Sequence, residues 1–166
     1  MSDNVFHIVE HDRELVMTRW FDAPRTLVWR AFAEPYLLAQ WWGPEGFTAT
    51  VDAHDFRVGG RFAITITSPN GDAFPGRWVF ETIEPPARIV YRNVVADAPA
   101  PAWKGNPPAL YTNTLTFEEI EGRTRLTFHV GFASETDRMD AVARGFGRGV
   151  AQALGKLEQL LMSLAP

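Results

Sequence analysis

The hydrophobic positions follow two different periods along the chain. Between residues 47 and 132, apolar and polar side chains alternate in a series of short segments, and after residue 137 the apolar side chains recur every three to four residues. Alternation predicts strands with one buried face, whereas the longer period predicts an amphipathic helix. Turn-forming pairs such as Asn70-Gly71 and Glu121-Gly122 separate the alternating segments. The pattern predicts an antiparallel sheet followed by a long helix.

Seven strands and two short helices are predicted before that last helix. The first strand covers residues 13–21, and the other six cover 47–54, 61–67, 76–83, 88–95, 110–118 and 123–132. Pro24 suits the first turn of a helix, and Asp22 is expected to cap it. Pro35 ends this helix and starts a second one, which Gly43-Pro44 ends. Two short helices therefore interrupt the chain after the first strand.

The last segment, residues 137–164, is predicted to form one helix capped by Ser134 or Thr136. Its apolar stripe contains Val142, Phe146, Val150, Ala153, Leu157, Leu160 and Leu164. The segment also holds four glycines, Gly145, Gly147, Gly149 and Gly155. Each costs a helix interior roughly 1 kcal/mol relative to alanine, so they need a reason. Either the helix packs closely on the sheet, or Gly145 and Gly149 leave room for a ligand.

Composition narrows the class of protein. A chain of 166 residues suits a single domain, residues 1–166 with a core of about 13–162. There is no cysteine, which excludes disulfides, thiolate metal sites and a cysteine nucleophile. The net charge of −4 without a basic block argues against nucleic acid as a partner. With no membrane span and no secretory signal in the pattern, we expect a cytoplasmic protein.

Several short sequence motifs, together with the order of the elements, point to a known family. They are Phe21-Asp22-Ala23-Pro24, Trp29, Glu34-Pro35, Trp41-Trp42-Gly43-Pro44 and Gly59-Gly60-Arg61. From about Leu15 to Leu161 the chain resembles the START-like polyketide-cyclase superfamily abbreviated SRPBCC, in the branch named after the activator of a heat-shock-protein ATPase. The resemblance implies an α+β helix-grip fold. In that fold a curved seven-stranded antiparallel sheet wraps around the C-terminal helix, with an apolar cavity between them.

The resemblance implies less about activity. Similar proteins include lipid carriers, hormone receptors, polyketide cyclases and co-chaperones, so the fold alone does not decide the function. Many members of the branch carry a glycine-tryptophan pair in the terminal helix, where this chain has Gly149-Val150. The smaller valine would enlarge the pocket.

The candidate ligand-binding residues are those expected on the inner face of the sheet and helix. They are Trp41, Phe62, Ile64, Trp78, Phe80, Tyr91, Asn113, Phe128, Phe146 and Val150. Asn113 shares the inward parity of Tyr111 and Leu115, so its amide needs a partner, either a backbone group or a ligand carbonyl. Asn93 shares the parity of Tyr91, while His129 is expected to point outward. Trp41 and Trp42 either plug one end of the sheet or form the rim of the pocket.

Three functions remain open. The first is binding of a small hydrophobic ligand, with a stress-related role suggested by the resemblance. The second is a cyclase or dehydratase, which needs an acid or base in the pocket; an inward-facing His54, Asp55 or Glu81 would favour it. The third is a co-chaperone-like interaction protein.

The sequence contains no recognisable set of catalytic residues, so whether the chain is an enzyme is left open. The four histidines are scattered, and we expect neither a metal nor a cofactor. Pairing through a sheet face, or through the proline-rich loop 97–109 around Trp103, would give a homodimer.

Overall fold

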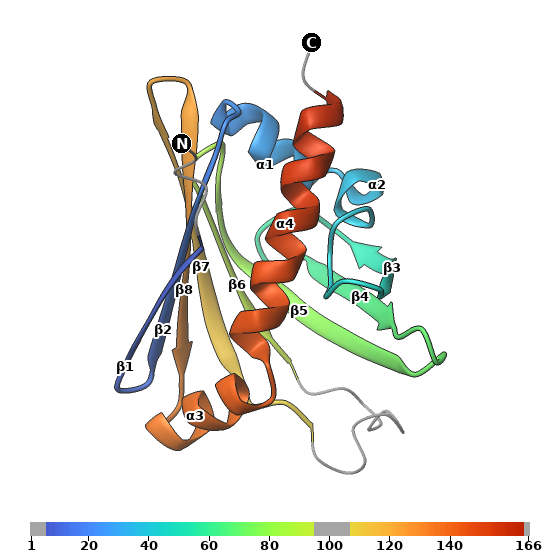
Figure 1. The fold of residues 1–166 in the computed structure, drawn as a ribbon. Coiled ribbons are helices and arrows are strands. Elements are labelled where there is room, and N and C mark those ends of the chain that lie inside the picture. The colour runs from blue at the N-terminus through green and yellow to red at the C-terminus, as the bar shows by residue number, and fades with distance from the viewer. Residues whose placement is uncertain (1–5, 95–106, 165–166) are drawn as a thin grey trace.

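The computed structural model describes residues 6–94 and 107–164. In these residues, antiparallel strands form one curved eight-stranded sheet in the order β1-β2-β8-β7-β6-β5-β4-β3 (Figure 1). The strands are β1 (His7–His11), β2 (Glu14–Phe21), β3 (Thr48–His54), β4 (Arg61–Thr67), β5 (Ala73–Glu84), β6 (Arg88–Asn93), β7 (Tyr111–Ile120) and β8 (Arg123–Phe132). The Glu121-Gly122 turn joins β7 to β8 with positive φ at both residues, as a two-residue type I′ hairpin turn requires.

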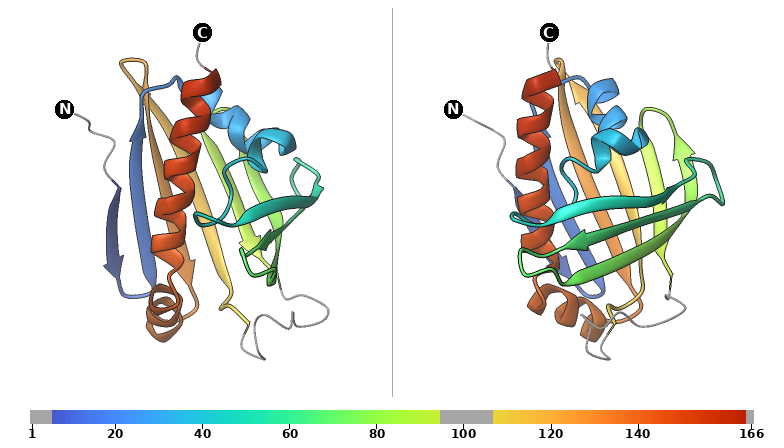
Figure 2. Two further views of the ribbon diagram at one scale, coloured as in Figure 1. Left: turned by 45° about the vertical axis from the view of Figure 1, so that its right-hand side comes forward. Right: turned by 90° about the vertical axis from the view of Figure 1, so that its right-hand side faces the viewer.

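Four helices accompany the sheet: α1 (Arg25–Ala33), α2 (Pro35–Leu38), α3 (Glu135–Ala143) and α4 (Phe146–Leu164). α4 runs across the concave face of the sheet, with α1 and α2 near one end of the sheet and α3 at the other (Figure 2). The predicted helix-grip fold is confirmed. Each of these helices is too short or too polar to cross a bilayer, as judged over the residues that the structure describes.

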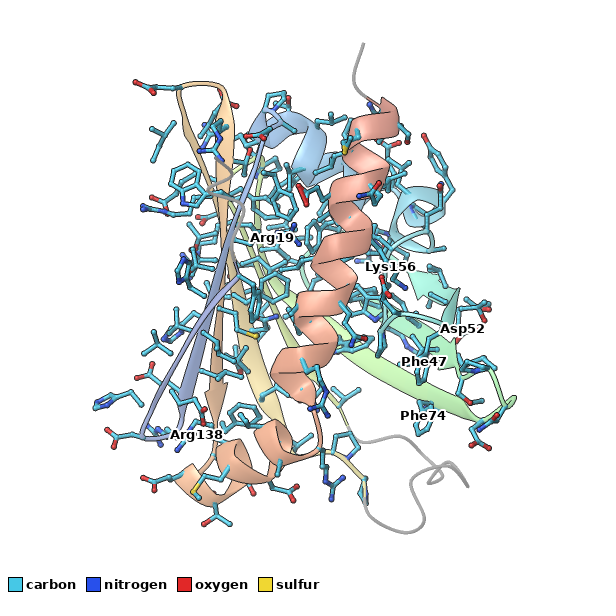
Figure 3. All side chains as sticks on the ribbon, viewed as in Figure 1. Arg19, Phe47, Asp52, Phe74, Arg138 and Lys156 are labelled. Atoms are coloured by element: carbon cyan, nitrogen blue, oxygen red, sulfur yellow. The ribbon has the colours of Figure 1, made fainter. Side chains whose placement is uncertain are left out.

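The α4 helix is held by packing and by charge. Its buried side chains, Ala153, Leu154, Leu157 and Leu161, join the core formed by the inner face of the sheet. The buried guanidinium of Arg19 on β2 forms an ion pair with Glu158 on α4, and Figure 3 shows Arg19 between the sheet and the helix. A second ion pair, between Arg138 on α3 and Glu10 on β1, ties the start of the C-terminal segment to the edge of the sheet.

The strand β1 was not expected from the sequence, so the sheet has eight strands where seven were predicted. All of its side chains are exposed, and the alternation that would have indicated a strand is therefore missing. It forms through backbone pairing with β2, from His7 opposite Thr18 to His11 opposite Glu14. Ile8 also packs against Gly147, where an added Cβ would lie only 2.6 Å from its Cδ1. A side chain at position 147 would push aside the end of the exposed Ile8 side chain.

The prediction of one helix over 137–164 was wrong. The chain breaks between α3 and α4 at Gly145, whose φ of +95° lies in the region that favours glycine. Ser134 caps α3, and its Oγ accepts a 3.1 Å hydrogen bond from the amide of Asp137. Val142 therefore lies on α3 and not on the same helix as the rest of the predicted stripe. Within α4, Leu154 and Leu161 are buried, whereas Leu160 and Leu164 of the predicted stripe are only partly buried.

The expected Asp22 cap was also wrong. The N-cap of α1 is Pro24, which makes no side-chain cap. Asp22 instead accepts a 2.6 Å hydrogen bond from Arg123 on β8. The exposed amide of Arg25 is bound by Glu119 of β7 at 2.8 Å, so a carboxylate distant in sequence replaces the local cap.

Candidate functional site: a cavity between the helix and the sheet

A cavity of about 430 Å³ lies between α4 and the concave face of the sheet. Its walls come from the connection after α2, from β4 to β8 and from the two C-terminal helices. The lining residues are Trp41, Trp42, Gly43, Pro44, Phe47, Ile66, Phe74, Tyr91, Pro108, Ala109, Tyr111, Asn113, Phe128, Asp140, Ala141, Arg144, Gly145, Phe146, Gly149, Val150, Ala153 and Leu154. Most of this lining is apolar, as is typical of sites for small organic molecules.

A second cavity, of about 570 Å³, adjoins the first. The two share a wall that includes Trp42, Ile66, Phe74, Tyr111 and Phe146. Phe74 on β5 lies beside Phe47, with 6.1 Å between the ring centroids, at the far end of the β3–β5 part of the sheet (Figure 3). The two spaces therefore form adjacent compartments.

The structure brings most of the predicted site residues to these compartments. Trp41, Tyr91, Asn113, Phe128, Phe146 and Val150 line the first cavity, and Ile64, Trp78 and Phe146 line the second. Phe62 and Phe80 line neither. Their rings stack on each other at 5.3 Å and are buried. Inward parity was therefore correct for both, but neighbouring rings separate them from the open space.

The structure also distinguishes the two tryptophans of the Trp41-Trp42 pair. Trp41 is fully buried, and its indole N–H donates a 3.0 Å hydrogen bond to the carbonyl of Ala31. Trp42 faces both cavities and packs edge-on against Phe62 and Trp78. Trp41 therefore anchors the wall, whereas Trp42 divides the two compartments.

The contacts between α4 and the loop that follows Trp42 were not predicted from the sequence. Lys156 on α4 donates to the carbonyls of Trp42 and Pro44, at 3.4 and 3.2 Å, and burial lowers the pKa of its amine (Figure 3). Gln152 accepts a 3.0 Å hydrogen bond from the amide of Glu45. Gly149 faces this loop, since an added Cβ would lie 3.7 Å from the Pro44 side chain. The polar side of α4, where Gln152 and Lys156 lie four residues apart, was the feature of the sequence that could have indicated these contacts.

The polar part of the lining lies on β6 and β7. The Nδ2 of Asn113 donates a 2.9 Å hydrogen bond to the hydroxyl of Tyr91, while its Oδ1 has no partner among the described residues. The indole of Trp78 donates to the hydroxyl of Tyr111, also at 2.9 Å. Burial raises the pKa of Tyr111 to about 12 and raises that of Tyr91 further. Both phenols therefore stay protonated and neutral at ordinary pH.

Charged residues are few in the lining. Asp140 and Arg144 line the first cavity and pair with each other, with 3.0 Å between their charged atoms. His129 points outward and contacts Glu14, as its parity predicted. Within 6–94 and 107–164, no three histidine or acidic side chains come together as a metal would require.

Comparison with known proteins gives the family. A model of the "Activator of Hsp90 ATPase homolog 1-like protein" family matches residues 22–162. The chain belongs to this family. The resemblance to the SRPBCC superfamily seen in the sequence motifs is thereby confirmed.

Solved structures agree with this family assignment. A solution NMR structure of a protein from Arthrobacter aurescens is 29% identical, with a TM-score of 0.85 over 95% of this chain and 91% of that one. A crystal structure of a protein from Mycobacterium smegmatis is also 29% identical, with a TM-score of 0.82 over 97% and 100% of the two chains. A protein from Nitrosomonas europaea is 25% identical, with a TM-score of 0.78 over 92% and 96%. A comparison with curated proteins found no match.

Proposed function

We propose that this protein binds a small hydrophobic molecule in the cavity between α4 and the sheet. The observation that carries the proposal is the apolar, aromatic-walled space of about 430 Å³. Ligand sites in proteins have volumes of roughly 300–1,000 Å³ and mostly apolar linings with a few polar groups. Removing apolar ligand surface from water contributes roughly 25 cal/mol per Å², which supplies the driving force.

The walls are already packed, which favours binding without rearrangement. Trp42 lies 5.4 Å from Phe62 and 5.5 Å from Trp78, measured between ring centroids, and Phe146 lies 5.3 Å from Tyr111. Edge-to-face contacts of this kind fix ring orientations. A cavity whose walls are held in place loses little side-chain entropy when it is filled.

Binding is favoured over a cyclase or dehydratase reaction by the positions of the ionisable groups. Asp55 pairs with Arg57 and Glu81 with Arg92 at exposed positions. His54 is half-buried, contacts the carbonyl of Phe32 at 3.0 Å and stacks on Phe56. None of these three acids or bases lines either cavity. A general acid or base must reach the reacting atom, and these three are directed elsewhere. Asp140, an acid that does line the first cavity, is paired with Arg144.

A co-chaperone-like role and a stress-related role stay predictions, since no contact among the described residues specifically favours either. A cytoplasmic location and a homodimer stay predictions as well. Residues 97–106 of the loop around Trp103, one of the two surfaces considered for a homodimer, lie outside the described residues.

Fluorescence titration with N-phenyl-1-naphthylamine, an uncharged apolar probe, tests the proposal. The wild-type protein is expected to bind about one equivalent saturably. Val150→Trp places an indole in the lining and should weaken binding at least tenfold. Met162→Trp adds the same ring at an exposed position of the same helix and should leave binding unchanged. Absence of saturable binding to the folded wild-type protein, or equal binding by folded Val150→Trp, would show the proposal to be wrong.

A further inference from the structure

Asn113 is a buried amide with an unmet hydrogen-bonding group in the wall of the first cavity. The residue is 2% exposed and lines the cavity. In the sheet it lies between Tyr91 on β6 and Val130 on β8. Tyr91 supplies the 2.9 Å contact to Nδ2, and the valine side chain supplies no polar atom. The Oδ1 atom is thus left without a partner in the described part of the chain.

This deficit does not depend on which way the amide is turned. If the amide were rotated by 180°, Oδ1 would accept from the Tyr91 hydroxyl, and Nδ2 would be the end without a partner. In the orientation observed, the Tyr91 oxygen accepts from Asn113, and its own proton has no acceptor among the described residues. In both orientations the Asn113–Tyr91 pair has unused hydrogen-bonding capacity.

Such a deficit is costly when nothing fills it. An unsatisfied buried polar group costs about 1–3 kcal/mol, whereas leucine at the same place would fill a similar volume without this cost. Buried polar atoms without partners are few in native proteins, and each calls for a partner that completes it. Asn113 lines the first cavity, so a molecule bound there lies beside this amide. Because Oδ1 itself has less than 1 Å² of accessible surface, the amide must turn slightly toward the cavity to meet the missing group.

We propose that the ligand of this cavity is an uncharged apolar molecule that carries a hydroxyl group, and that Asn113 and Tyr91 recognise this hydroxyl. The inference rests on the proposed binding function. The ligand O–H donates to Oδ1 of Asn113, and its oxygen accepts the proton of Tyr91. One hydroxyl thereby uses both groups that the protein leaves open.

The surrounding charges favour a neutral ligand. Tyr91 and Tyr111 stay protonated because burial raises the pKa of each phenol. Asp140 and Arg144, the charged residues of the described lining, are paired with each other. A carboxylate brought to Asn113 would lose its hydration and meet no unpaired cation in that lining, which is strongly unfavourable.

Two probes of nearly the same shape test the inference: 2-naphthol, which has a hydroxyl, and 2-methylnaphthalene, which has a methyl group in its place. Each is measured by displacement of N-phenyl-1-naphthylamine at pH 7. The wild-type protein is expected to bind 2-naphthol about tenfold more tightly than 2-methylnaphthalene, since one good hydrogen bond contributes roughly that factor. Asn113→Leu should remove most of this preference, because the methyl group then meets an apolar wall and only the Tyr91 hydroxyl is left to bind 2-naphthol.

Thr112→Val serves as the control, since Thr112 is exposed on the opposite face of the same strand and should leave the preference unchanged. If Asn113→Leu does not fold, Tyr91→Phe removes the donor to the ligand oxygen and should lower the preference for 2-naphthol. The inference is overturned if the wild-type protein binds both probes equally, or if the preference survives in every folded variant. If neither probe nor the dye binds, the proposed function itself fails.

Discussion

The indole N–H of Trp78 donates a hydrogen bond of 2.9 Å to the hydroxyl of Tyr111. Trp78 lies on β5 and Tyr111 on β7, with β6 between them in the sheet. The bond therefore joins two strands that share no backbone ladder, and both residues line the second cavity. Because the bond spans β6, it holds two walls of that cavity at a fixed separation.

Removal of the Tyr111 hydroxyl should destabilise the protein. Tyr111→Phe leaves the Trp78 indole N–H without its acceptor, and the expected loss is about 1–3 kcal/mol in the free energy of unfolding. Urea denaturation followed by tryptophan fluorescence measures it. Tyr36→Phe removes the same hydroxyl from a side chain that is 62% exposed, and this change should cost less than about 0.5 kcal/mol. Equal stabilities of the two variants would show that the Trp78–Tyr111 bond adds nothing.

The two glycines that flank the start of α4 should respond oppositely to alanine. Gly145→Ala forces a side chain onto a φ of +95° and is expected to destabilise the protein by about 1–3 kcal/mol. Gly149 lies within α4, and its added Cβ would meet Pro44 at an ordinary 3.7 Å. Gly149→Ala should therefore be neutral or stabilising by up to about 1 kcal/mol.

Thermal or urea unfolding of both variants tests this contrast. The reverse order of stabilities would contradict the assignment of Gly145 as the helix break. Since Gly149 also lines the first cavity, its alanine variant should bind N-phenyl-1-naphthylamine more weakly without loss of stability.

His54 should make stability depend on pH below about 6.5. Burial lowers the pKa of its half-buried imidazole in the folded state below the usual value of 6.5. As the pH falls below 6.5, the unfolded chain takes up a proton that the folded chain does not bind, so the stability falls until the folded pKa is reached. The urea midpoint should therefore decrease between pH 7.5 and pH 5.5 by more in the wild-type protein than in His54→Gln. An equal decrease in both proteins would exclude His54 as the cause.

Asn93 should hold the beginning of β7 in place. Its Oδ1 accepts a 2.6 Å hydrogen bond from the amide of Tyr111, and its Nδ2 donates to the carbonyl of Ala109 at 3.0 Å. Asn93→Ala removes both contacts and should destabilise this part of the chain by about 1–3 kcal/mol. Amide hydrogen exchange should then become faster at Tyr111, while the amide of Leu115 in the middle of β7 keeps its protection. Unchanged exchange at Tyr111 would show that the segment is held by other contacts.

Much of the sheet follows from local pattern. Alternation placed Asn113 inward and His129 outward, and both positions agree with the structure, because a strand side chain has only two faces to choose from. The residues of β4 and β8 were predicted with their observed bounds, since turn residues and alternation coincide there. The family motifs then supplied the arrangement of these strands around a helix.

Other features depend on contacts between distant parts of the chain. β1 is exposed throughout and forms because β2 offers an edge for backbone pairing, which no side-chain pattern of its own indicates. Phe62 and Phe80 have the parity of cavity residues, but neighbouring rings cover them. The helical periodicity of the sequence likewise continues past Gly145 and predicted a single helix there, whereas the chain turns at this residue with a positive φ between two helices.

The sequence alone therefore determined which side chains face inward, because a single strand sets the parity of its own residues. Which inward side chains border open space was decided by tertiary packing. Asn113 shows the difference most directly: its burial follows from position 113 on a strand, but its unpaired Oδ1 depends on Tyr91 from one neighbouring strand and Val130 from the other. Whether a buried polar atom finds a hydrogen-bond partner depends on the side chains around it, and these side chains come together only when the strands pair.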